Sequence, residues 1–230
     1  MSSVEPLPLI KMRVEETYQQ LITQIQMLVI VCKRKKWSIT QKPIVKRPAS
    51  DRLINKIQNQ IGQTLPEDLK ILFRMSRHVE FRYQFDETLS EEFRQNFSGE
   101  ISWSLKELPN RVKEFKAWID AFLDPKCNDI AEIEKYREEW KNMIPFMWVP
   151  NGDVIGVNLD PSEVIYFSHE GDEMHGKVLG KNLWEFLDFY SRVGFAGSED
   201  WQLEPFFDFD KNEMITSGEK IERFIKLLYE

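Results

Sequence analysis

Short apolar runs alternate with turn sequences between Ile144 and Tyr190, and this pattern constrains the fold more than any other feature of the chain. Asn151-Gly152 is typical of tight hairpins because both residues accept positive φ. Asp160-Pro161-Ser162 and the polar stretch 169–172 are further turn signals. We therefore predict three antiparallel strands in succession: Ile144–Val149, Val154–Leu159 and Val164–Phe167.

A helix is expected directly after these strands. Asn182 stands three residues before Glu185, which fits an N-cap residue and its reciprocal partner at the third helical position. The apolar residues that follow recur at helical spacing and share one face: Leu183, Phe186, Leu187 and Tyr190. The segment thus reads as a β-meander followed by an amphipathic helix.

The first 49 residues predict a helix with a basic end and then a linker. Apolar residues recur at helical spacing from Val14 to Val29, and Lys33-Arg34-Lys35-Lys36 follow them. Cations near a helix C-terminus interact favourably with the helix dipole, whereas a membrane-surface helix or a nucleic-acid-binding arm is the alternative interpretation. Two prolines between Trp37 and Ser50 indicate a linker. We therefore divide the chain into an N-terminal helix with its basic arm and linker (1–49) and a main domain (50–230).

Helical and strand patterns alternate in blocks through the main domain. Apolar residues at helical spacing predict helices over 51–62, 64–73, 108–122, 130–143 and 216–228. Thr64 with Glu67, and Thr216 with Glu219, are predicted capping pairs. A period of two over 79–85 and again over 101–105 predicts half-buried strands. The expected fold class is α+β, an antiparallel sheet packed against several helices, with an extra N-terminal helix.

The composition supports an extensive core in a soluble protein. Hydrophobic residues make up 42% of the chain and aromatic residues 13%, which argues against global disorder. Cys32 and Cys127 lack the neighbours of metal or redox motifs, so we expect two reduced thiols. The chain start lacks the apolar segment of a secretory signal, and the longest apolar stretch, Met27–Cys32, is far too short to span a bilayer. We expect a cytoplasmic location.

Charge is distributed unevenly along the chain. Residues 1–50 carry nine Lys or Arg and three Asp or Glu, whereas the remaining 180 carry 22 basic and 35 acidic residues. An acidic body suits a basic protein partner, because complementary charge speeds encounter and disfavours wrong partners. It argues against direct nucleic-acid binding, which needs clustered Lys and Arg.

The turn from His169 to His175 carries residues that can bind metal, but their spacing matches no metal motif. The two histidines are six residues apart, unlike the HExxH spacing that places both on one helix face. The acidic residues between them do not follow the calcium-loop pattern. We interpret this turn as acidic and solvated or in contact with a partner. A metal-dependent hydrolase built on it is the alternative, and no cofactor is expected.

Asp153 and Asp160 are the other candidate catalytic pair, since glycosidases use two carboxylates at a set separation. Both stand in turn sequences, where Asp is common for conformational reasons. The chain contains no GxSxG nucleophile motif and no glycine-rich phosphate-binding or dinucleotide-binding motif. We therefore expect no catalytic residues and a protein that acts by binding.

Two blocks of residues resemble the Smi/Knr branch of the SUKH superfamily. They occur in the family's order and cover about residues 50–195: Ile61-Gly62…Leu65-Pro66-Glu67-Asp68-Leu69…Leu72-Phe73, then Pro145…Asn151-Gly152-Asp153…Gly156…Leu159-Asp160…Val164-Ile165-Tyr166-Phe167…His169-Glu170…Leu183…Phe186-Leu187. The Asn-Gly turn that family members often carry after the first helix is absent from Met75–Val79. The segment 85–142 has no matching motif.

The resemblance implies a binding function. The group includes a yeast cell-wall glucan-synthesis regulator and many bacterial immunity proteins that block polymorphic or contact-dependent toxins. It implies an immunity protein that occludes the active site of a cognate toxin, such as a nuclease, and a regulatory scaffold is the alternative. If exposed, the apolar segment that starts at Trp201 would be an interaction patch. The acidic turns and this apolar segment together supply the residues that we predict to bind the partner: Asp153, Asp160, Glu170, Asp172, Glu173 and Trp201.

Overall fold

The computed structural model describes residues 7–85, 89, 91–93, 97–122, 140, 142–170 and 173–230. Its strands form antiparallel sheets. The first sheet has the order β1 (Ser38–Val45), β2 (His78–Gln84), β3 (Ser98–Ser104). The second has the order β4 (Met143–Trp148), β5 (Val154–Asn158), β6 (Val164–Phe167), β7 (Val178–Gly180), and a short hairpin pairs β8 (Phe207–Asp208) with β9 (Glu213–Met214).

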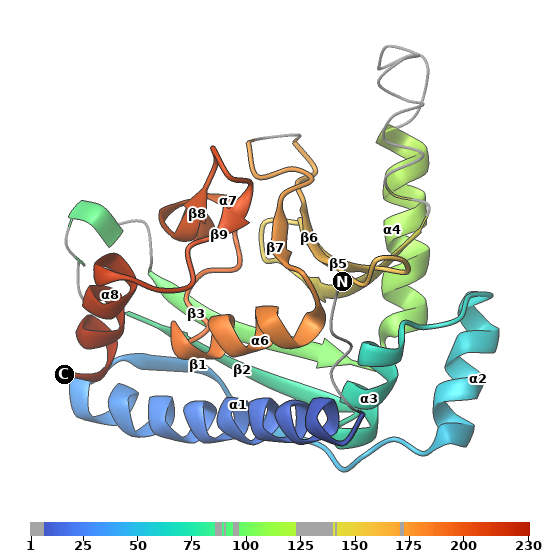
Figure 1. Ribbon diagram of the computed structural model, residues 1–230, viewed down its shortest axis with the longest axis horizontal. Coiled ribbons are helices and arrows are strands. Elements are labelled where there is room, and N and C mark those ends of the chain that lie inside the picture. The colour runs from blue at the N-terminus through green and yellow to red at the C-terminus, as the bar shows by residue number, and fades with distance from the viewer. Residues whose placement is uncertain are drawn as a thin grey trace.

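Helices cover these sheets and confirm the predicted α+β class with an N-terminal helix (Figure 1). They are α1 (Leu7–Lys35), α2 (Asp51–Ile61), α3 (Glu67–Met75), α4 (Leu108–Phe122), α6 (Leu183–Arg192), α7 (Asp200–Leu203) and α8 (Glu219–Tyr229), with 3-10 turns at Glu91–Phe93 and Glu204–Phe206. The long α1 runs beneath the first sheet and contacts α6, whereas α4 stands upright at the side of the second sheet (Figure 1).

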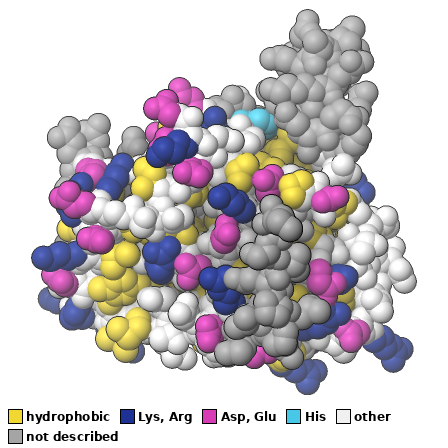
Figure 2. Space-filling model, in the orientation of Figure 1, with side chains coloured by type: hydrophobic (Ala, Val, Ile, Leu, Met, Phe, Trp, Pro, Cys, Tyr) yellow, Lys and Arg dark blue, Asp and Glu magenta, His cyan; other side chains and the backbone are white. Residues whose placement is uncertain are grey.

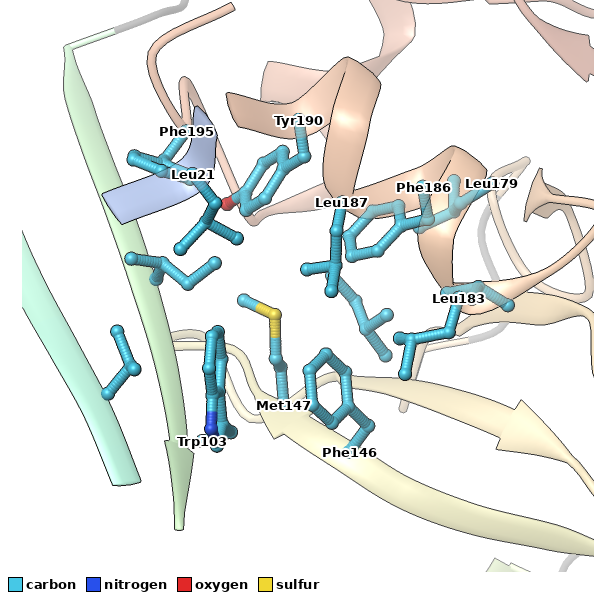
Figure 3. Close-up of a cluster of buried hydrophobic side chains, with 14 of the residues drawn as sticks. Leu21, Trp103, Phe146, Met147, Leu179, Leu183, Phe186, Leu187, Tyr190 and Phe195 are labelled. Carbon is cyan, nitrogen blue, oxygen red and sulfur yellow. The ribbon is translucent and has the colours of Figure 1, made fainter. Parts of the chain in front are cut away.

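The core joins the two sheets through aromatic and aliphatic side chains. Figure 3 shows Leu21 of α1, Trp103 of β3, Phe146 of β4 and the buried face of α6 pointing toward one another. The rings of Trp103 and Phe146 are stacked with their centroids 5.9 Å apart. The predicted apolar face of α6 is confirmed, because Leu183, Phe186, Leu187 and Tyr190 are all buried. Each such side chain contributes roughly 1.5–3 kcal/mol through burial.

The linker predicted from Trp37 to Ser50 is wrong over most of its length, because Ser38–Val45 form β1. This strand pairs with β2 from Ser38 opposite Gln84 to Val45 opposite Val79, with two irregularities in register. Pro43 lacks an N–H group, and an edge strand tolerates this loss because one of its sides has no strand partner. Lys42 and the irregularities also discourage pairing with another chain. Pro43 therefore marks a sheet edge and not a flexible connection.

Two predicted capping pairs are also wrong. Helix α3 begins after Pro66 and α8 after Gly218, and neither start has a side-chain cap from Thr64 or Thr216. The helix predicted over 130–143 lies largely outside the described residues, as does Cys127, and Met143 begins β4. The strands β7, β8 and β9 were not predicted because they have only three, two and two residues.

The N-terminal helix belongs to the same core as the sheets. The predicted stripe is buried along α1, from Val14 through Leu21 and Ile25 to Leu28. At its basic end, Arg34 donates to the carbonyl of Tyr229, and Lys35 Nζ lies 2.7 Å from the carbonyl of Leu227 in α8. In the described part of the chain, no helix is both long and apolar enough to cross a membrane.

Candidate partner-binding surface

The β4–β5 turn is built around Asn151, Gly152 and Asp153, as the hairpin signal predicts. Gly152 has φ of 104°, and its N–H donates to the carbonyl of Val149 over 3.0 Å. The N–H of Asp153 donates to Asn151 Oδ1 over 3.0 Å. An Asn side chain that binds the backbone two residues further on stabilises such a turn. The turn therefore fixes the direction in which the Asp153 carboxylate points.

That direction is inward, and Asp153 is fully buried. Its Oδ2 accepts from Tyr166 Oη over 2.6 Å and from Asn151 Nδ2 over 2.7 Å. Its Oδ1 accepts from the His169 N–H over 2.8 Å and lies 2.5 Å from His169 Nδ1. Burial raises the pKa of Tyr166, and its hydrogen bond to Asp153 adds to the shift. Asp153 thus ties the β4–β5 turn to the turn after β6, and it has no surface that a partner could reach.

The turn after β6 carries the exposed acidic residues. Glu170 and Glu173 are exposed, and Asp172 lies outside the described residues. Glu170 Oε1 is 3.7 Å from Nε2 of His169, whose side chain is 35% exposed. Because Val154 pairs with Phe167, this turn lies at the same end of the second sheet as Asp153. The structure therefore places Glu170 beside the β4–β5 turn, and Glu173 is exposed on the same loop between β6 and β7.

The two histidines of this turn have separate partners. His175 Nδ1 is 3.0 Å from the carbonyl of Ser168, and its ring packs against those of Trp140 and Phe167 at 5.3 and 5.6 Å. His169 instead faces Asp153. Within the described ranges, no cluster of three or more His, Cys, Asp or Glu side chains could hold a metal ion.

Asp160 is exposed but lies at the other end of β5. Asp153 precedes this strand and Asp160 follows it. Seven residues of extended chain span about 20 Å. The structure therefore does not bring Asp153 and Asp160 together as the two carboxylates of a hydrolase, and it separates Asp160 from the other predicted binding residues.

Trp201 lies next to the β4–β5 turn although it is 50 residues away from Asn151 in sequence. Asn151 Nδ2 is 3.4 Å from Oδ1 of Asp200, which precedes Trp201 in α7. The Trp201 ring is half-buried, and its centroid is 5.2 Å from that of Phe97, which is 43% exposed. Most of the apolar segment after Trp201 is buried, including Leu203 and Phe206. Of the aromatic residues in the segment 201–207, only Trp201 therefore contributes to the surface.

Phe97 was not identified from the sequence, where it stands as a single aromatic residue before β3. We define the acidic–aromatic surface as the following group: Phe97, Glu170, Glu173, Asp200 and Trp201. Figure 2 shows further acidic side chains in its upper left part, over the β8–β9 segment of Figure 1. Lys177 Nζ lies 5.6 Å from the ring centroid of Phe209, which places this segment beside the loop between β6 and β7.

Comparison with known proteins places most of this architecture in one family. The family model described as the SMI1 / KNR4 family (SUKH-1) matches residues 48–188. The match begins just before α2 and ends within α6, so α1, β1 and Trp201 lie outside it. A search of curated proteins finds no match.

Proposed function

The chain belongs to the SMI1/KNR4 family (SUKH-1), and from this premise we propose that it is an immunity protein that binds and neutralises a cognate toxin. Membership supports a toxin-immunity or related regulatory role at the level of the family. The proposed mode of action is binding without catalysis, in which the protein covers the active site of the toxin. A toxin with a basic active-site cleft, such as a nuclease, fits this proposal because such clefts bind phosphate groups.

The observation that supports this proposal is the contact between Asn151 and Asp200. It joins the β4–β5 turn, which lies within the family match, to Asp200 and Trp201, which lie outside it. Exposed carboxylates speed association with a basic partner. A Trp that buries much of its area on binding contributes strongly to affinity. We infer that Glu170 and Glu173 steer the partner and that Trp201 and Phe97 anchor it.

The first test identifies the partner by a pull-down from the source cells at low salt, with the full chain as bait. We expect one stoichiometric, basic, toxin-like protein encoded by the adjacent open reading frame. Several weak partners would instead support the alternative, a regulatory scaffold.

The second test maps the surface by charge reversal. Glu170→Lys with Glu173→Lys should weaken binding of the captured partner about tenfold or more, and chiefly by slowing association. Trp201→Ala should chiefly accelerate dissociation. The matched control is Asp160→Lys with Glu163→Lys, which makes the same charge change at the other end of β5. An equal loss in the control pair would show that this surface is not the interface.

A further inference from the structure

A groove whose charge is opposite to that of the acidic–aromatic surface lies between α2, the start of β2, the end of β3 and the start of α4. Four cationic side chains line it: Lys46, Lys56, Arg77 and Lys106. Glu107 is the one carboxylate among the residues that line it in the described structure. We propose that this basic groove binds an acidic peptide segment of a partner protein.

The end of the first sheet brings three of these cations together. The Lys46 N–H donates to the carbonyl of His78 over 2.9 Å, and the Leu105 N–H donates to the carbonyl of Arg77 over 2.9 Å. Lys106 follows Leu105 directly. Backbone hydrogen bonds therefore fix the positions of the Cα atoms from which these side chains extend. Helix α2 contributes Lys56 to the lining of the groove.

In the part of the chain that the structure describes, ion pairs do not neutralise the four cations of the groove. Among the described residues, no ion pair involves any of these four cations. Some basic residues elsewhere are paired, as Arg74 is with Asp51 at 2.8 Å and Arg223 with Glu92 at 2.9 Å. In a chain of net charge −7, a groove that keeps several unpaired cations indicates a negatively charged ligand.

The walls of the groove favour a peptide over a nucleic acid. Between the cations lie apolar side chains from Leu53, Ile57, Leu105 and Pro109. A peptide with alternating acidic and apolar side chains satisfies both kinds of contact. Single-stranded nucleic acids bind grooves in which aromatic side chains stack on bases, and no Phe, Tyr or Trp is among the described residues that line this groove.

The inference is tested with peptides and fluorescence anisotropy at low salt. The probe is a labelled 12-residue peptide of alternating Glu and Leu, and its comparison peptide carries Gln at each Glu. We expect the acidic peptide to bind at least about tenfold more tightly. Lys56→Glu with Arg77→Glu should remove this preference. Equal binding of the two peptides would overturn the proposal.

The control variant is Lys33→Glu with Lys36→Glu, which makes the same charge change at the far end of α1 (Figure 1). It should keep the preference for the acidic peptide, as should the variant Glu170→Lys with Glu173→Lys, because the groove is separate from the acidic–aromatic surface. Two results would contradict the proposal. One is tighter binding of a 12-nucleotide oligothymidine at the same site. The other is self-association, seen by light scattering, that Lys56→Glu with Arg77→Glu abolishes.

Discussion

At the scale of single residues, two buried carboxylates are accommodated in different ways. Asp153 is held by hydrogen bonds from Asn151, Tyr166 and His169. Glu100 is held by Arg82 Nε at 2.6 Å and by Ser198 Oγ, which donates over 2.9 Å. Burial raises the pKa of Glu100, and the charge of Arg82 opposes this rise without cancelling it. An ionised Glu100 therefore costs folding free energy at neutral pH.

The variant Glu100→Gln tests this cost. Because the folded-state pKa is raised, protonation of Glu100 stabilises the protein fully below the ordinary value of 4.5, and this stabilisation is lost as the pH rises through the raised value. Relative to wild type, the Gln variant should therefore gain in free energy of unfolding as the pH rises from 4.5. Urea unfolding at a series of pH values measures the difference. A difference that moves in the other direction would mean that the ion pair with Arg82 dominates.

At the scale of elements, the start of α6 shows which capping signals are realised. Asn182 Oδ1 accepts from the N–H groups of Trp184 and Glu185 at 3.0 and 2.9 Å. Replacing an N-cap Asn with Ala typically costs about 1 kcal/mol. We expect this loss for Asn182→Ala in thermal or urea unfolding. Thr64→Ala is the matched control and should change stability by less than about 0.5 kcal/mol, because α3 begins without a cap from Thr64. Equal losses in the two variants would be incompatible with the observed caps.

Elements with a regular apolar pattern could be predicted from the sequence, as β2 with Val79, Phe81 and Tyr83 shows. Edge strand β1 could not, because its burial alternates only weakly and it contains Pro43. The site was predictable only in part. Asn151-Gly152 indicates the turn, but the burial of Asp153 depends on Tyr166 and His169, which come from another strand and turn. Such distant contacts leave no local pattern in the sequence.

At the scale of the whole molecule, the core extends beyond the region that matches the family. The match ends at residue 188, yet Phe224 of α8 packs against Phe93 and Phe206 with centroid distances of 4.9 Å. Gly194 has φ of 69°, and a Cβ there would lie 2.8 Å from Leu228 in α8, 3.0 Å from Tyr83 Oη in β2 and 3.5 Å from Leu28 in α1. The N-terminal helix, the first sheet and α8 therefore meet at one point (Figure 1). We infer that α1 and α8 fold with the matched region as one cooperative unit.

Removing residues 216–230 should therefore abolish cooperative folding, although these residues lie outside the family match. The deletion takes away the buried side chains of Ile221, Phe224 and Leu228. At roughly 1.5–3 kcal/mol each, their burial is comparable with the total stability of a typical domain, about 5–15 kcal/mol. Far-UV circular dichroism and Trp fluorescence should show no shared unfolding transition for the truncated chain. An unchanged midpoint would mean that α8 is an appendage.

A pair of single substitutions in the full chain tests more mildly whether α8 belongs to the cooperative unit. Leu228 is fully buried and Leu227 is 36% exposed, so they differ in burial but not in chemistry. Leu228→Ala should cost about 2–5 kcal/mol, the usual range for a buried Leu. Leu227→Ala should cost less than about 1 kcal/mol, since surface substitutions change stability little. If the two probes of unfolding still coincide in Leu228→Ala, the loss is shared by the whole molecule. If they separate, α8 unfolds on its own and the cooperative unit ends before it.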